Sequence, residues 1–335
     1  MYDPSKLATR DPVLTAFSVG YADQDLFGLE IFPAVGVNSM HGRYRVFDRS
    51  DWLIFPAIRE PGTVANEIMG GKWSEDTFNI REYALQAPVL DEEREEIAQN
   101  FEEPGLDVSP ERDAVSLVGR SLNLQHEKKV ADVTRDVTQY AAGNTVTLTG
   151  TSRWNDYTTL VGGATQPWQT VSNPINNIRA GLDKVYRLTG RQVNKMVFSE
   201  DAFRQLAEHP RIVNRFQNFD LIRPDAVRRL LDYEGEIVIA NSKYNSADNI
   251  DAAEVITDLW GQDVWMGIVD EGAGVRGKTF GKTFQRPYGG VAKPTDRWRE
   301  EDRKADLFRT QWRWDTKIIS NVAGYLIKTA VDVPA

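Results

Sequence analysis

The sequence predicts an α+β fold, and three observations support this prediction. Residues 109–142 carry apolar side chains at helical spacing, residues 43–89 contain two strand-like runs around a glycine- and proline-containing middle, and residues 160–300 alternate between short helices and short strands. A helical stripe and an alternating strand pattern have different periods, so these stretches form different elements. We therefore expect one large domain or two closely joined domains.

Composition limits the class of protein. The chain has 335 residues, of which 41% are hydrophobic and 27% charged, and this is enough for a substantial core. The sequence contains no apolar run of about 18 residues and no signal-peptide pattern, which predicts a protein that neither spans a membrane nor is exported from the cytosol. The net charge of −9 argues against a dedicated nucleic-acid reader, although it permits weak contact with packed DNA.

Residue types that bind metals or catalyse reactions are scarce. The chain has no cysteine, which removes disulfides, thiolate metal ligands and cysteine nucleophiles. Its three histidines, His41, His126 and His209, are far apart in sequence and are expected to be surface or packing residues. There is no serine nucleophile motif and no isolated pair of carboxylates. We therefore predict no catalytic residue, no cofactor and no metal site, and hence a protein that is not an enzyme.

Residues 1–42 are predicted to form an N-terminal arm. The stretch 21–37 contains several apolar residues, but Gly28, Pro33 and Gly36 interrupt it and prevent long regular structure. The apolar side chains of such a segment become buried by packing on another part of the protein or on a neighbouring molecule.

Residues 43–89 predict a long extended hairpin loop. The outgoing leg has strand-like runs at 44–47 and 52–58, and the returning leg runs from Trp73 to Leu85 and continues its alternation to Val89. A hairpin of this length with so few apolar residues is not stable alone in water. It packs either on its own domain or across an adjacent subunit, and we favour the second alternative.

Three apolar residues of the outgoing leg are the expected subunit contacts. These interface residues are Trp52, Phe55 and Ile58. They belong to the leg of the hairpin that we expect to lie across an adjacent subunit, where apolar burial would drive assembly.

A long helix is predicted over 109–142. Ser109 is a suitable N-cap, Pro110 suits the first helical position, and Gly143 provides a left-handed stop. This helix is too long to bury itself and is expected to act as a beam with other elements laid across it. The acidic stretch 91–100 before it is expected to be a short helix with a solvated face rather than a catalytic cluster.

The remaining chain predicts an α/β block and a closing hairpin. The block comprises a strand starting at Thr145, helices at 174–189, 200–208 and 224–231, and strands at 195–198, 237–240 and 264–269. The alternation over Leu307–Val331 predicts a hairpin that turns at 315–317 and pairs near the long helix. One domain would then be discontinuous in sequence.

Residues 272–279, GAGVRGKT, match a phosphate-loop pattern. In that interpretation Gly272 and Gly277 let backbone amides approach a phosphate, Lys278 reaches it, and Thr279 binds Mg²⁺. A phosphate loop must lead into a helix, whereas the alternation of Phe280, Lys282 and Phe284 predicts a strand. We interpret the match as coincidental.

Taken together, these parts resemble the major capsid proteins of tailed bacteriophages, whose fold is shared by herpesvirus floor domains and encapsulin shells. The resemblance lies in the order of the parts and in the phrases EYALQAPVLDEE, NKMVFSEDAFRQLAEHPRI, DVWMG and DTKIISNVAGYLIKTAV. It implies an N-terminal arm at 1–42, an extended hairpin loop at 43–89, a peripheral domain at 90–159 and 301–335 with the spine helix 109–142, and a central (axial) domain at 160–300.

The resemblance also implies a function and partners. The chain would be a structural subunit of an icosahedral capsid, self-assembling into hexamers and pentamers that enclose double-stranded DNA. Partners would be other copies of itself, a separate scaffolding protein, a portal protein and, as an option, a decoration protein, with assembly in the host cytoplasm. Some relatives are joined by a lysine–asparagine bond, but Lys72 has no matching partner and no cross-link is predicted. The alternatives are an encapsulin-type compartment and a phosphate-loop NTP-binding protein.

Overall fold

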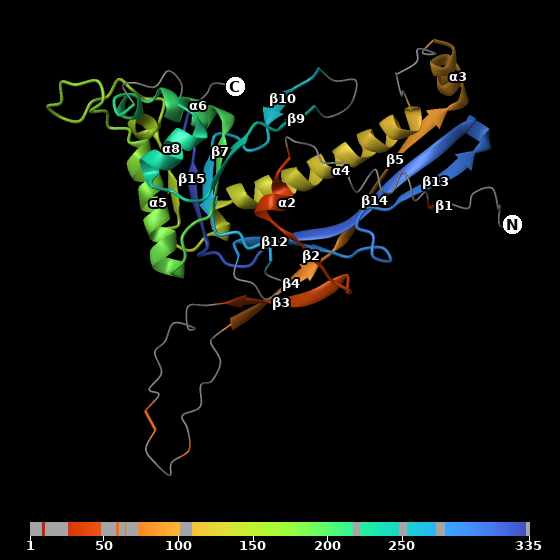
Figure 1. Ribbon diagram of the computed structural model, residues 1–335, viewed down its shortest axis with the longest axis horizontal. Coiled ribbons are helices and arrows are strands. Elements are labelled where there is room, and N and C mark those ends of the chain that lie inside the picture. The colour runs from red at the N-terminus through yellow and green to blue at the C-terminus, as the bar shows by residue number, and fades with distance from the viewer. Residues whose placement is uncertain are drawn as a thin grey trace.

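The computed structural model describes residues 9–10, 26–47, 58–59, 64, 73–100, 109–216, 222–247, 253–272 and 279–332. The molecule is elongated, with a five-stranded sheet and its helices at one end and the acidic helix α3 (Asp91–Asn100) at the other (Figure 1). A single helix, α4 (Pro110–Arg135), runs between the two ends.

Helix α4 begins where the sequence predicted and ends earlier. The Ser109 side chain accepts a hydrogen bond from the Arg112 amide, and Pro110 occupies the first turn. The prediction that the helix continues to residue 142 was wrong, because it ends at Arg135. The Asp136 carboxylate accepts hydrogen bonds from the Thr138 amide and hydroxyl, and this local bonding starts a 3₁₀ turn at 137–139 instead.

A six-stranded sheet lies along one side of α4. Its central strand, β14 (Ala305–Ile318), pairs with β5 (Arg81–Leu90) on one edge and with β13 (Thr295–Glu300) and β12 (Gly281–Gln285) on the other. The outer strands are β1 (Thr9–Arg10) on β13 and β2 (Ala34–Gly36) on β12. The apolar stripe of α4 packs on this sheet, with Val115 against Val89 and Phe308. Other elements therefore pack along α4, as the sequence predicted.

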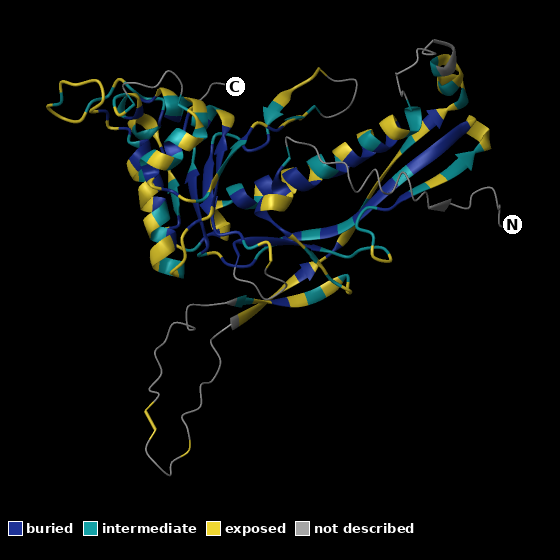
Figure 2. Ribbon diagram, viewed as in Figure 1, coloured by how far each residue is buried: buried dark blue, intermediate teal, exposed yellow. Residues whose placement is uncertain are grey.

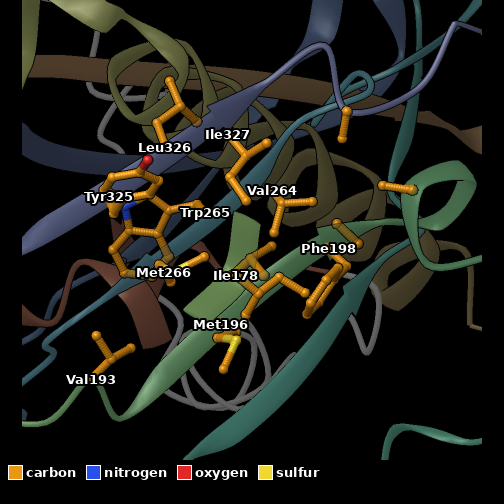
Figure 3. Close-up of a cluster of buried hydrophobic side chains, with 14 of the residues drawn as sticks. Ile178, Val193, Met196, Phe198, Val264, Trp265, Met266, Tyr325, Leu326 and Ile327 are labelled. Carbon is orange, nitrogen blue, oxygen red and sulfur yellow. The ribbon is translucent and has the colours of Figure 1, made fainter. Parts of the chain in front are cut away.

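The second sheet has five strands and forms the other end of the molecule. Its order is β6-β15-β11-β7-β8, with bounds Thr145–Thr147, Gly324–Lys328, Val264–Gly267, Lys195–Ser199 and Glu236–Ala240. Helices α5 (Pro174–Thr189) and α6 (Glu200–Glu208) pack on its strands. Helices α7 (Pro210–Val213) and α8 (Pro224–Leu231) contribute Ile212, Val227 and Leu231 to the same core. Side chains from α5, β7, β11 and β15 meet in its core (Figure 3), where Phe198, Val264 and Leu326 are fully buried.

The C-terminal segment differs from the predicted hairpin. No turn occurs at 315–317; instead β14 continues straight to Ile318, because residues 314–318 pair with β12. The chain leaves the sheet at 319–323 and enters the other sheet as β15, which pairs with β11 and β6. The two strands therefore connect the two sheets rather than pairing with each other.

The long hairpin is shorter in its paired part than predicted. Strand β3 (His41–Phe47) pairs antiparallel with β4 (Trp73–Asn79), as expected for its two legs. After Ile80, however, the returning chain becomes β5 and pairs with β14 over ten residues, so 81–89 belongs to the large sheet and not to the hairpin. The alternation to Val89 signalled a strand correctly but not its partner.

The smaller elements lie outside these two sheets. The short helix α2 (Gly28–Ile31) contacts α4 (Figure 1). A small hairpin of β9 (Lys243–Asn245) and β10 (Ile256–Asp258) also lies near α4, where Lys128 lies over the Tyr244 ring. Figure 2 shows buried residues concentrated along both sheets and the inner face of α4. No described helix is both long and apolar enough to cross a membrane.

Candidate assembly surface

The root of the β3–β4 hairpin is fixed to the large sheet by aromatic packing. The Phe78 ring stacks on Phe284 of β12 with centroids 4.6 Å apart, and Tyr44 lies 5.3 Å from the same ring. The Tyr44 hydroxyl donates a hydrogen bond to Asp76 at 2.7 Å and also lies 3.1 Å from the Ile318 carbonyl, which shares its single proton. The base of the hairpin is therefore held rigidly.

Gly42 makes this packing possible. A Cβ atom built on it would lie 2.5 Å from the edge of the Phe78 ring, closer than any side chain tolerates. The β3–β4 ribbon lies across β14 from α4 (Figure 1), and β14 contacts β4 directly.

Of the three predicted interface residues, the structure describes Ile58, whose exposed fraction is 91%. Val64, further along the same segment, is 87% exposed. Trp52, Phe55 and Lys72 lie outside the described residues. Two apolar side chains exposed to this extent lose contact with water only if another surface covers them.

An ion cluster at the far end of the molecule joins four elements. Asp306 of β14 is 5% exposed and pairs with Arg94 of α3 at 2.7 Å and with Arg297 of β13 at 2.6 Å. Arg299 of β13 holds Asp91 of α3 through two hydrogen bonds of 2.6 and 2.5 Å. These bonds fix the acidic helix α3 to the sheet.

The start of α4 belongs to the same cluster, because Glu111 accepts a hydrogen bond from Arg94 at 2.9 Å. Burial opposes ionisation of Asp306, but hydrogen bonds from Arg94 and Arg297 hold the pKa of its carboxyl below its usual range. Sequence inspection missed Asp306, since it is one acid in an alternating strand and its partners are more than 200 residues away or across a neighbouring strand.

The described residues at the end of the glycine-rich match, and the strand that follows it, do not fit a phosphate loop. Gly272 and Thr279 are described, whereas Gly277 and Lys278 lie outside the described residues. Thr279 is fully buried and its hydroxyl donates to the Ile268 carbonyl at 3.2 Å, so it is engaged by the backbone. The chain continues into strand β12, as the alternation predicted, and not into a helix.

The histidines have the packing and surface roles that the sequence predicted. His126 lies between Trp312 and Trp314, with its Nε2 3.0 Å from the Thr283 hydroxyl, and His209 lies 3.3 Å from the Ser172 hydroxyl. Burial lowers the pKa of His126 to about 3 and that of His209 to about 4, so both are neutral at pH 7. His41 is exposed. Among the described residues, no three potential metal ligands come together.

Comparisons with known proteins identify what the chain resembles. No family model matches it. It is 25% identical over 330 residues to the major capsid protein of Burkholderia phage BcepMu, a match that covers 96% of this chain and 97% of that protein. It is also 25% identical over 293 residues to the major capsid protein of Pseudomonas phage JBD67, covering 85% and 86% of the two chains.

Solved structures show the same fold. A phage-related protein from Bordetella bronchiseptica RB50 matches with a TM-score of 0.72 and 24% identity, covering 97% of this chain and 98% of that one. The capsid protein of cyanophage P-SCSP1u matches with a TM-score of 0.52 and 11% identity over 89% and 86% of the chains. The chain therefore has the α+β capsid fold. Its resemblance to phage major capsid proteins, inferred from the order of its parts, is confirmed.

Proposed function

We propose that this chain is the major structural subunit of a bacteriophage capsid and that it self-assembles into a closed icosahedral shell of hexamers and pentamers. The observation that supports this most strongly is the end-to-end match to a phage major capsid protein, which includes the hairpin and not only the core. Its role is structural rather than catalytic.

The apolar hairpin segment gives this proposal a physical basis. Ile58 is almost fully exposed on a segment whose root is held by Tyr44, Phe78 and Phe284. Trp52, Phe55 and Ile58 of one copy pack on a neighbouring copy, and this burial, repeated at every contact in the shell, drives assembly. Charge pairs set the register of the contacts.

The proposal extends to the domains and partners. In this proposal residues 1–42 form the arm and 43–80 the intersubunit loop. The peripheral domain comprises α4 and the six-stranded sheet, and the axial domain comprises the five-stranded sheet with helices α5 to α8. The chain passes from the first sheet to the second between β14 and β15. The shell assembles in the host cytoplasm with a separate scaffolding protein and a portal protein, accommodates a decoration protein, and encloses double-stranded DNA through weak contacts.

Electron microscopy of the purified chain, expressed alone and with the adjacent scaffolding gene, tests this function. We expect closed shells of uniform diameter in at least one preparation, and double-stranded DNA in particles isolated from infected cells. Soluble monomers under both conditions would contradict the proposal. Shells that contain a cargo enzyme instead of DNA would indicate an encapsulin-type compartment.

A further inference from the structure

A buried carboxylate joins the N-terminal segment to the spine helix α4. The Glu127 side chain is 1% exposed and lies between α4 and the start of α2. One of its oxygens accepts a hydrogen bond from the Gly28 amide, and the other accepts one from the Trp260 indole N–H at 2.9 Å. The first turn of α2 has no side-chain cap of its own, so Glu127 supplies an acceptor from 99 residues away.

The residues around this carboxylate pack closely against the chain at Phe27 and Gly28. The Phe27 ring stacks on Trp260 with centroids 5.1 Å apart. A Cβ on Gly28 would lie 2.6 Å from the Glu127 carboxylate and 3.3 Å from His126, so only glycine brings the backbone this close. On the far side of α2, a Cβ on Gly281 would lie 2.0 Å from the Phe32 ring, which shows equally tight packing there.

This attachment sets the position of the hairpin root. Directly after α2, the Pro33 carbonyl accepts a hydrogen bond from Thr283, and β2 runs parallel to β12. The Val37 amide then donates to the Gln285 carbonyl at 2.9 Å, and β3 begins at His41. Backbone hydrogen bonds to β12 therefore hold the chain between Gly28, which Glu127 contacts, and the start of the hairpin.

The groups around Glu127 do not neutralise it. On α2, Glu30 adds negative charge, although Lys195 of β7 holds Glu30 at 3.3 Å. On α4, the adjacent His126 is neutral at pH 7.

The charged side chains on the other elements near Glu127 interact with residues other than Glu127. In the turn that carries Trp260, Asp263 is paired with Arg135 at 2.7 Å. The charge of Lys282 on β12 interacts with Asp270. Burial is therefore the largest influence and raises the pKa of Glu127 to about 7, against the opposing effect of its N–H donors.

We propose that Glu127 is a proton-linked anchor for the segment 26–36, so that this segment, which leads into the hairpin root, binds α4 more tightly as the pH falls and less tightly as it rises. This inference rests on the proposed function only in treating the hairpin as an arm between subunits. The anchor itself belongs to the single subunit.

Proton linkage determines whether attachment of the segment strengthens or weakens as the pH rises. The attached carboxyl has a pKa of about 7 and a detached one has the ordinary value of 4.5, so the attached state binds the proton more tightly. Attachment is strongest below the ordinary pKa and weakens by about tenfold for each pH unit as the pH rises towards 7, where it levels off.

Hydrogen–deuterium exchange on unassembled subunits tests this proposal without requiring a shell. We expect the protection of peptides covering 26–36, corrected for intrinsic exchange and referenced to peptides of α5, to fall by between about tenfold and a hundredfold from pH 5 to pH 8. The Glu127→Gln variant should show no such dependence. The Asp132→Asn variant, which removes an exposed acid of the same helix, should keep the wild-type profile.

A second variant separates titration from a purely structural role. Trp260→Phe removes one N–H donor that lowers the pKa of Glu127, so the point at which protection levels off should move to higher pH. If wild-type protection at 26–36 does not change or increases with pH, or if Glu127→Gln keeps the wild-type profile, the proposal is wrong. Absence of shells in the same preparation would bear on the proposed function alone.

Discussion

Replacing Trp52, Phe55 and Ile58 together with serine is expected to leave a folded subunit that no longer assembles. Each apolar side chain that becomes buried at a contact contributes about 1.5–3 kcal/mol, so each copy loses on the order of 5 kcal/mol of association free energy. The fold is spared because the hairpin root, with Phe78 and Phe284, is untouched. Sedimentation velocity and electron microscopy measure assembly, and circular dichroism measures folding.

A matched control keeps the apolar character of the same positions. The variant with Trp52→Phe, Phe55→Leu and Ile58→Val should still form shells, since it changes shape but little apolar area. Normal particles from the serine variant would show that these residues are not the contacts that drive assembly. An unfolded serine variant would instead show that they pack within their own subunit.

Replacing Asp306 with asparagine is expected to destabilise the subunit by about 3 kcal/mol, the lower end of the range for breaking a buried ion pair. Arg94 and Arg297 would then face each other without the carboxylate that both contact. The lower end applies because these arginines remain partly exposed, with 26% and 44% of their side-chain surface accessible. Urea denaturation of the non-assembling serine variant, with and without Asp306→Asn, measures the difference.

The pH dependence provides a further check on the same residue. Because the folded pKa of Asp306 is below its usual value, its contribution is present above about pH 4 and is lost as the pH falls. The acid-induced loss of stability should therefore be smaller in Asp306→Asn than in its parent. Asp302→Asn, which removes an exposed acid from the adjacent 3₁₀ turn, should change neither quantity. Equal stability of the Asp306 and Asp302 variants would contradict the role of the cluster.

The sequence predicted those elements whose ends are fixed by local chemistry. Helix α5 has Pro174 in its first turn and Gly190 at its left-handed end, and both bounds match the structure. Helix α6 likewise begins after Ser199, whose side chain accepts from the Ala202 amide. Caps and stops of this kind act over a few residues, which is why a single sequence reveals them.

Elements whose ends depend on distant partners were predicted less well. Strand β14 continues through Asp315 because Phe284 of β12 pairs with it, and nothing within the segment itself requires this. Similarly, the division of the returning leg at Ile80 follows from the pairing of β5 with β14. Strand length and strand partner are properties of the sheet, so alternation alone specifies neither.

The burial of acidic side chains was not predictable either. Glu127 follows His126 in α4, and its burial depends on α2, about a hundred residues earlier. The sequence contains one signal, an acid at a position of α4 that faces the core. It does not show that the Gly28 amide and the Trp260 indole lie beside that acid, because only the fold brings these groups together. Ile58, in contrast, could be proposed as an interface residue from the sequence, because a hairpin so long and with so few apolar residues is not expected to be stable alone. Its contact with a neighbouring copy stays a prediction.

Site-specific photo-cross-linking from position 58 tests most directly whether the hairpin covers a neighbouring copy. Because the chain has no cysteine, Ile58→Cys provides a single thiol that a benzophenone maleimide labels selectively. After assembly and irradiation, we predict a ladder of covalently joined copies on a denaturing gel, with the cross-link on another subunit. Products joined only within single chains, from particles that are otherwise intact, would contradict the account.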